Sequence, residues 1–246
     1  GPGDPELFTL KGVKVLEAAE VVFYDALVNI ELLKYATNAK EKIFVGKRYG
    51  CHALSQKEIN LLIQEKSLQY KNLVRLKGGD PFIFGRAQEE IEAAKEVGME
   101  VCVVPGISSA LAVPASQMIS LTSRGVSESF WVVTGTTCIG DVSSDIYLAA
   151  QSKATIVILM AMNKLEQIMD IFSSQGKKET SVAIIQNGTT DQAKTIRGKV
   201  KDIYFRALHA EMGNPAIIII GDVVDLNADL SPVIQEKVNL EVLKEA

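Results

Sequence analysis

The chain has 246 residues, of which 47% are hydrophobic and 23% are charged. This composition is that of an ordinary globular protein, and it excludes a disordered chain, a collagen-like repeat and a disulfide-framed mini-protein. Lysine and arginine number 26 against 30 aspartate and glutamate residues, so the net charge is −4. An acidic chain argues against nucleic acid as the main partner. The length suffices for one large domain or for two of about 120 residues, each with its own core.

The three cysteines are far apart, and no pair has the C-x-x-C spacing of a metal or redox motif. A structural zinc site needs about four ligands, so we expect reduced thiols in a cytoplasmic protein and no bound metal. The longest apolar stretches, 154–162 and 216–220, are well short of the ~20 residues of a membrane span. No secretory signal pattern is present, so we expect no membrane partner. The sequence begins with glycine, so we expect residues upstream of it.

The first half of the sequence alternates short apolar runs with longer segments of helical period. Predicted helices cover residues 9–20, 55–66 and 88–97, and predicted strands cover 21–24, 43–45, 73–76 and 101–104. Ser55 and Glu58 have the spacing of a capping box at the start of the second helix, and Gly98 is placed to end the third. Strands that are apolar throughout and alternate with helices indicate a parallel sheet covered on both faces.

The pattern then changes. Residues 121–129 (LTSRGVSES) are polar with a central glycine and are predicted as a linker. Strands are predicted at 130–134, 154–160, 182–186 and 216–220, with a helix at 163–175 that ends at Gly176. A further short strand at 194–199 would make this sheet mixed. We therefore predict an α/β protein of two α/β domains, residues 1–121 and 122–246.

Three glycine-bearing loops fall at or near the strand-to-helix junctions of the first half. They are GPGDP at residues 1–5, KGGDP at 77–81 and VPGISS at 104–109. Taken alone, each is as readily explained by a turn, and Ser108 or Ser109 by a helix N-cap. Open α/β sheets nevertheless bind ligands at the carboxyl ends of their strands. The three loops together predict a ligand site, in which Asp80 accepts hydrogen bonds from an amine or hydroxyl. The spacing matches neither a Rossmann fingerprint nor a P-loop, so it does not name the ligand.

These motifs occur in an order that resembles the tetrapyrrole methylase family. The stretches that carry the resemblance cover almost the whole chain: GPGDPELFTLKG, VVFYDALV, VGKRYGCH, LVRLKGGDPFIFGR, VVPGISSALA, VVTGT and NPAIIIIGDVV. The resemblance implies two α/β domains with a cofactor cleft between them, a homodimer, and S-adenosyl-L-methionine as methyl donor, released as S-adenosyl-L-homocysteine. Carried over by motif, the cofactor-binding residues would be Pro2, Gly78, Gly79, Asp80, Ile83, Ser108, Ser109, Met160, Gly188 and Ala216. For Met160, ordinary core packing is the alternative.

The implied reaction is C-methylation of uroporphyrinogen III at two ring carbons, C2 and C7, which gives precorrin-2 for sirohaem or cobalamin biosynthesis. The resemblance places a base at Asp25 and a proton donor at Lys47. Their alternatives are a turn cap for Asp25 and a solvated basic pair for Lys47 with Arg48. Because the substrate carries many carboxylates, cationic side chains should hold it, and the candidates besides Lys47 are Arg48, Arg86 and Arg124.

The sequence departs from the family at Ser123 and Thr136, where histidine is common, and no strand precedes the GPGDP motif. The two side chains put the substrate contacts in question, and the absent strand bears on the cofactor cleft. Alternative functions are methylation of a later precorrin, methylation of ribosomal RNA or of a protein residue, and cofactor binding without catalysis. The negative net charge of the chain disfavours RNA as the substrate.

Overall fold

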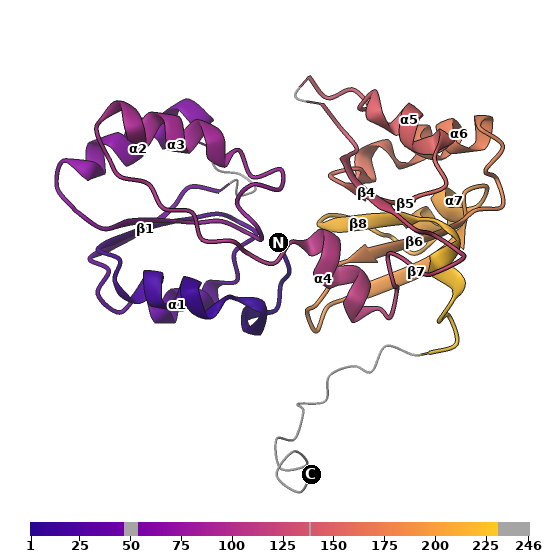
Figure 1. Cartoon of the computed structure of the whole chain (residues 1–246), viewed down its shortest axis with the longest axis horizontal. Coiled ribbons are helices and arrows are strands. Elements are labelled where there is room, and N and C mark those ends of the chain that lie inside the picture. The colour runs from indigo at the N-terminus through magenta and orange to yellow at the C-terminus, as the bar shows by residue number, and fades with distance from the viewer. Residues whose placement is uncertain (47–53, 138, 231–246) are drawn as a thin grey trace, which may run out of the picture. The chain divides into compact units, whose positions relative to one another are not determined.

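The computed structural model describes residues 1–46, 54–137 and 139–230, which form two compact units (Figure 1). Unit 1 consists of Gly1–Ala112, Ile185–Lys194 and Asn214–Ala216. Unit 2 consists of Val113–Ile184, Thr195–Gly213 and the described residues from 217 onward. The division thus falls within helix α4 (Ser109–Ser116), before the expected boundary at residue 121, and two loops of the second half join unit 1.

The polar segment 121–129 is part of unit 2 rather than a linker. Ser123 and Ser127 form an isolated antiparallel bridge, and Ser127 is buried. The Ser127 hydroxyl accepts a hydrogen bond from the backbone N–H of Thr155 at 3.1 Å. A polar composition with a central glycine is therefore explained here by a hydrogen-bonded turn, which the sequence does not distinguish from a linker.

Unit 1 is built on a parallel sheet whose strand order is β2-β1-β3. The strands are β1 (Val21–Tyr24), β2 (Glu41–Phe44) and β3 (Leu73–Leu76). Successive side chains of β1 point to opposite faces: Val22 packs with Leu16 of helix α1 (Leu10–Glu17), whereas Val21 and Phe23 pack with Ile59 of helix α2 (Gln56–Ser67). Figure 1 shows α1 below β1, with α2 and helix α3 (Ala87–Glu96) above it. The predicted parallel sheet with two covered faces is confirmed.

The helices of unit 1 begin and end close to the predicted positions. They are α1 (Leu10–Glu17), α2 (Gln56–Ser67) and α3 (Ala87–Glu96), with short 3₁₀ helices η1 (Pro5–Leu7) and η2 (Ile30–Tyr35). Thr9 caps α1 by accepting from the N–H of Gly12. The capping box of Ser55 and Glu58 is present at the start of α2. Gly98 follows α3 with φ of +77°, a left-handed conformation that ends helices.

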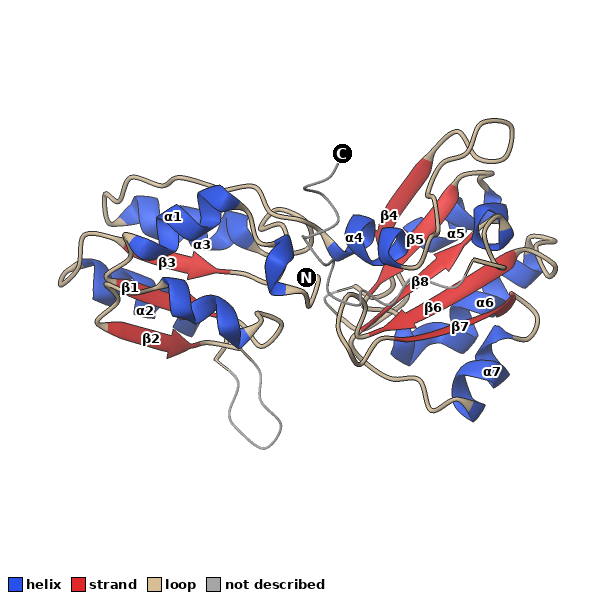
Figure 2. Ribbon diagram, turned by 90° about the horizontal axis from the view of Figure 1, so that it is seen from below, coloured by secondary structure: helices blue, strands red, loops and turns tan. Residues whose placement is uncertain are grey.

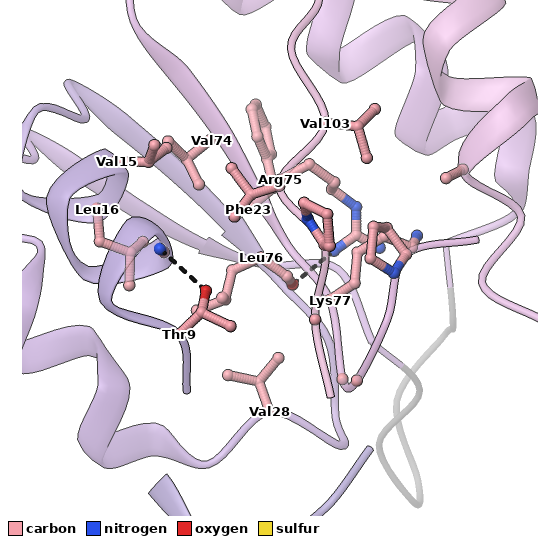
Figure 3. Close-up of a pocket in the computed structure, with 18 of the residues that line it drawn as sticks. Thr9, Val15, Leu16, Phe23, Val28, Val74, Arg75, Leu76, Lys77 and Val103 are labelled. Atoms are coloured by element: carbon pink, nitrogen blue, oxygen red, sulfur yellow. Dashed lines mark hydrogen bonds between the residues drawn. The ribbon is translucent and has the colours of Figure 1, made fainter. Parts of the chain in front are cut away.

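The predicted strand at residues 101–104 is wrong, because this segment pairs with no strand and has no regular secondary structure. A pocket of about 260 Å³ lies along β3, and its lining includes all four β3 residues together with residues 99–107. Figure 3 shows Val103 across this space from Phe23 and Arg75. An apolar run becomes a strand only where a neighbouring backbone pairs with it. The sequence of the run itself does not show whether such a partner exists in the fold.

Unit 2 contains a sheet of order β4-β5-β8-β6-β7 (Figure 2). The strands are β4 (Phe130–Thr134), β5 (Thr155–Leu159), β6 (Ser181–Gln186), β7 (Lys194–Lys199) and β8 (Ala216–Ile220). β4 is parallel to β5, and β5 is antiparallel to β8, so the predicted mixed sheet is confirmed. Trp131, the single tryptophan of the sequence, lies on β4 and is 41% exposed.

The helices of unit 2 pack in sequence, α5 on α6 and α6 on α7. They are α5 (Asp145–Gln151), α6 (Leu165–Ser174) and α7 (Ile203–His209), with 3₁₀ helices η3 (Met162–Lys164) and η4 (Asp222–Asp225). The core is rich in fully buried isoleucines, among them Ile156, Ile158, Ile218 and Ile219, with Phe172 of α6. Among the described residues, no helix is long and apolar enough to cross a membrane.

Candidate functional site

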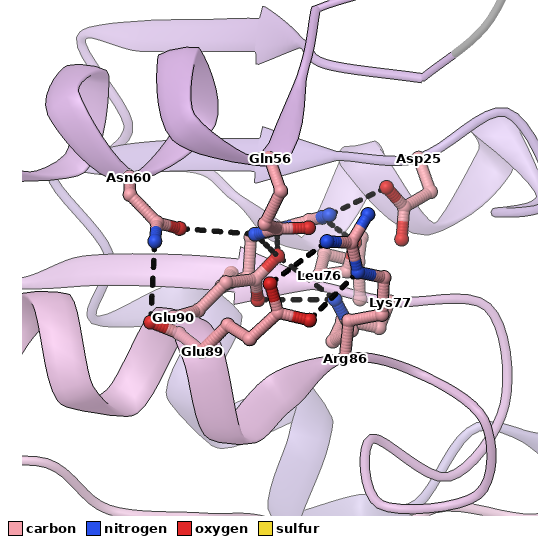
Figure 4. A network of polar contacts seen from close by, with 9 residues as sticks. Asp25, Gln56, Asn60, Leu76, Lys77, Arg86, Glu89 and Glu90 are labelled. Carbon is pink, nitrogen blue, oxygen red and sulfur yellow. Dashed lines mark hydrogen bonds and ion pairs between the residues drawn. The ribbon is translucent and has the colours of Figure 1, made fainter. Parts of the chain in front are cut away.

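A network of charged side chains lies at the carboxyl end of the parallel sheet of unit 1 (Figure 4). Asp25 follows β1 directly, and Arg75 is paired in register with Phe23, two residues before Asp25. Because side chains alternate along a strand, Arg75 and Asp25 share one face, and Arg75 Nη2 lies 2.5 Å from Asp25 Oδ1. Arg75 Nε also donates to Glu90 Oε1 at 3.1 Å, and Lys77 Nζ lies 3.0 Å from both Glu90 oxygens.

This network is largely shielded from water. The side chains of Arg75, Lys77 and Glu90 are only 14%, 9% and 7% exposed, whereas Asp25 is 28% exposed. Burial lowers the pKa of the Lys77 ammonium, and the nearby Arg75 guanidinium lowers it further, while Glu90 acts in the opposite direction. Two cations therefore face two carboxylates, which balances the charge. Among the described residues, no side chain or backbone group donates a hydrogen bond to Asp25 Oδ2.

Asp80 ties two of the glycine loops together. Its Oδ1 accepts from the N–H of Phe82 at 2.9 Å, and its Oδ2 accepts from the N–H of Gly106 at 3.0 Å. The loops approach so closely that a Cβ on Gly106 would lie 2.6 Å from the carbonyl oxygen of Gly79. Any bond from Asp80 to a ligand would use the remaining lone pairs of these two oxygens.

The first loop is held by a residue that sequence reasoning did not single out. The hydroxyl of Thr189 accepts from the N–H groups of Gly3 and Asp4 at 2.8 and 3.1 Å, and Asn29 Nδ2 donates to the Gly3 carbonyl at 2.8 Å. Thr189 has φ of +67°, which is a genuine outlier for a β-branched residue. Its neighbour Gly188 was predicted to bind the cofactor, so the strained turn lies within a predicted site segment.

Replacement of Thr189 by valine should lower the free energy of unfolding by about 1–3 kcal/mol. Valine keeps the shape and the β-branch but offers no acceptor, so the N–H groups of Gly3 and Asp4 lose their partner in a part-buried position. Chemical denaturation of the purified variant measures the change. Thr189→Ser is the matched control, since serine keeps the acceptor, and equal loss in both variants would contradict this explanation.

The predicted apolar wall for the cofactor is exposed on a loop of unit 1. Ile83 is 44% exposed between Phe82 and Phe84, which are 57% and 45% exposed. Three consecutive exposed large apolar side chains are unusual in a soluble unit and fit a loop that contacts a ligand. At the third glycine loop, Ser108 accepts from the N–H of Ala110 at 3.2 Å and so caps α4, as its sequence position predicts.

The remaining cofactor candidates divide between the units. Pro2, Gly78 and Gly79 line the pocket along β3, and Gly188 and Ala216 belong to unit 1. The N–H of Asn187, next to Gly188, donates to the carbonyl of Pro215, next to Ala216. Ser109 begins α4 in unit 1.

Met160 belongs to unit 2 and follows β5 directly. It is 52% exposed with φ of +55°, so the alternative of ordinary core packing does not hold. Its carbonyl accepts from the hydroxyl of Thr136 at 3.3 Å. A strained, exposed residue at the end of a strand is typical of functional positions.

The predicted substrate cations have different surroundings. Arg86, with a side chain 59% exposed, donates from Nε and Nη2 to the two carboxylate oxygens of Glu89, at 2.8 and 2.7 Å, so substrate carboxylates would compete with Glu89. Arg124 is exposed in the turn of unit 2. Lys47 and Arg48 lie outside the described residues, and their roles stay predictions. In the described ranges, no group of three or more histidine, cysteine, aspartate or glutamate side chains is placed to hold a metal.

Comparison with known proteins agrees with the motif order. A family model described as Tetrapyrrole (Corrin/Porphyrin) Methylases matches residues 1–204. The chain is 45% identical to the uroporphyrinogen-III C-methyltransferase of Methanocaldococcus jannaschii, over 92% of this chain and 94% of that protein.

Two solved structures have closely similar folds. One is the uroporphyrin-III C-methyl transferase of Thermus thermophilus complexed with S-adenyl homocysteine, which is 33% identical with a TM-score of 0.77, over 91% of this chain and 95% of that chain. The other is a cobalt precorrin-4 methyltransferase, 26% identical with a TM-score of 0.80, over 92% of this chain and 93% of that chain. The two α/β units, the glycine loops and these matches together show that the chain belongs to the tetrapyrrole methylase family.

Proposed function

We propose that the chain is an S-adenosylmethionine-dependent methyltransferase that acts on uroporphyrinogen III, methylates C2 and C7, and releases precorrin-2. The observation that carries this proposal is the position of Asp25 beside the KGGDP loop. Gly78 packs so closely on Leu27 that a Cβ there would lie 3.0 Å from the Leu27 Cβ. A carboxylate that can accept a proton therefore lies next to the loop proposed to hold the methyl donor.

The residues of unit 1 suit such a donor. Exposed Ile83 offers an apolar wall, and the KGGDP and VPGISS loops meet at two half-buried glycines, Gly79 and Gly106. Asp80 keeps the two loops in register through its bond to Gly106. When bound, the donor supplies a methyl group already activated by its sulfonium. The task left to the chain is to orient that group toward the substrate carbon, since displacement requires alignment.

Asp25 has the role of general base in this mechanism. Addition of a methyl group to a pyrrole carbon leaves the tetrapyrrole with a proton to lose, and Asp25 Oδ2 accepts it. Arg75 holds the other oxygen of the same carboxylate at 2.5 Å and so fixes its orientation. Three further parts of the proposal rest on the family resemblance. Lys47 is the proton donor, the arginines bind the substrate carboxylates, and two copies of the chain pair as a dimer.

The test is an anaerobic incubation of the protein with S-adenosylmethionine and uroporphyrinogen III, followed by mass spectrometry of the tetrapyrrole. A gain of two methyl groups is expected. If the donor binds but no methyl group is gained, the substrate is wrong. The fold similarity to a cobalt precorrin-4 methyltransferase then makes a later precorrin the second candidate. Failure to bind the donor at all would contradict the proposed function.

A further inference from the structure

Glu90 is the one charged residue among the buried residues of the described chain, with 6% of its surface exposed. A carboxylate removed from water is strongly unfavourable unless cations and hydrogen bonds compensate it. Glu90 has three such partners: Arg75, Lys77 and the side-chain amide of Gln56, which donates at 3.3 Å. The burial of the Glu90 carboxylate is therefore compensated, but Glu90 has no part in the mechanism described above.

Helix α3 is docked by contacts other than those of Glu90. Helix α3 is joined to α2 by other hydrogen bonds, from Asn60 Nδ2 to the Glu89 carbonyl at 3.3 Å and from Gln64 Nε2 to the Ala93 carbonyl at 2.8 Å. Buried Ala93 and Ala94 add an apolar contribution on the same helix. The carboxylate at position 90 therefore has its strongest partners in the two cations that it faces.

The guanidinium of Arg75 is fixed on three sides. Nη2 contacts Asp25, Nε donates to Glu90, and Nη1 donates to the Leu76 carbonyl at 3.0 Å. Without the carboxylate of Glu90, Arg75 and Lys77 would form an uncompensated buried pair of cations, and Asp25 would be the nearest counter-charge for both. Lys77 would then compete for Asp25, including the oxygen that the proposed mechanism reserves for the substrate proton (Figure 4).

We infer that Glu90 is a positioning residue for the methyl transfer: it holds Arg75 in place and keeps Lys77 away from Asp25, so that Asp25 faces the substrate with one free carboxylate oxygen. This inference rests on the proposed role of Asp25 as base. Glu90 acts through its two cations and touches no substrate atom.

The Glu90→Gln variant tests this role, because it removes the charge and keeps the shape. We expect kcat to fall by up to about 10²-fold, the cost of a misplaced catalytic group, with the KM for S-adenosylmethionine unchanged. The acid limb of the kcat–pH profile should move to lower pH, because uncompensated positive charge favours an ionised carboxylate. The charged side chains that face Asp25 in the described residues are those of Arg75 and Lys77. Glu90→Asp should restore part of the rate.

Glu92→Gln is the matched control, since Glu92 lies on the exposed side of the same helix and its one partner among the described residues is Gln88. Wild-type kcat in Glu90→Gln would overturn the inference. So would a lower kcat with an unshifted pH profile and no rescue by aspartate, because that result indicates a merely structural role. A crystal structure of Glu90→Gln in which Arg75 Nη2 stays 2.5 Å from Asp25 Oδ1 and Lys77 stays in place would also overturn it, whatever the activity. If the wild-type protein methylates no tetrapyrrole, the proposed function fails instead.

Discussion

Replacement of Asp25 by asparagine is expected to lower the rate of methyl transfer by about 10²-fold to 10⁴-fold, the usual contribution of a general base. Asparagine keeps the size of the side chain but does not accept a proton from the substrate at neutral pH. Arg75 retains its bonds to Glu90 and to the Leu76 carbonyl, so the variant should fold. Binding of S-adenosylmethionine should be preserved, because the glycine loops do not use the Asp25 carboxylate for their hydrogen bonds.

The measurement is the initial rate of tetrapyrrole methylation under anaerobic conditions, with calorimetry for donor binding. Glu41→Gln is the matched control, since Glu41 also lies on the sheet of unit 1 and its ion pair with Lys66 is 2.8 Å long. Loss of that ion pair should affect stability but not the rate. Full activity in Asp25→Asn, together with retained donor binding, would show that the base is another group.

Gly106→Ala should weaken S-adenosylmethionine binding by about 5-fold to 150-fold, the change in affinity that corresponds to an overpacking cost of about 1–3 kcal/mol. A Cβ at this position would lie 2.6 Å from the Gly79 carbonyl oxygen, 3.0 Å from its carbon and 3.2 Å from the Cα of Asp80. All three are backbone atoms, so no flexible side chain can move aside, and the KGGDP loop itself must shift. Forced overpacking of this kind costs about 1–3 kcal/mol, and the bond from the Gly106 N–H to Asp80 would be strained as well.

Calorimetric titration with S-adenosylmethionine measures this effect, and denaturant unfolding measures the accompanying loss of stability. Gly98→Ala is the control: Gly98 has φ of +77°, but a Cβ there meets nothing within 4 Å. That variant should lose about 1 kcal/mol of stability from its backbone conformation alone, with donor affinity unchanged. Equal donor affinity in Gly106→Ala and the wild type would mean that the two loops do not form the donor site.

Local patterns were sufficient for most of the fold. The predicted ranges of β1, β3, β4, β7 and β8 agree with the structure residue for residue. Runs rich in apolar and β-branched residues define all of these strands except β7. The capping box at Ser55 and the glycine at position 98 were also predictable, since both act within one helical turn. The strand predicted at residues 101–104 was wrong because strand pairing depends on a partner that is distant in the sequence.

The site was predicted residue by residue but not as a connected network. The role of Asp25 was implied by the family resemblance, whereas Asp80 was also indicated by the three glycine loops, and the roles of both residues are still proposals. The contact of Arg75 with Asp25 requires the register of β3 against β1, and its contact with Glu90 requires the docking of α3, neither of which is local. One clue was present in the sequence, a lone arginine in the apolar run LVRL, since a charge buried in a strand needs partners. Thr189 had no comparable clue, because its strain exists only in the folded turn.

The location of Trp131 determines what the commonest stability assay on this protein would report. Its indole is the only one in the sequence and lies on β4 of unit 2, whereas Asp25, Arg75, Glu90 and the glycine loops belong to unit 1. Tryptophan emission is sensitive to its local environment, and two units with separate cores need not unfold in one cooperative step. If unit 1 unfolds while the core of unit 2 stays folded, the emission of Trp131 does not report that unfolding. Variants of unit 1 are better followed by amide hydrogen exchange, which reads each unit separately.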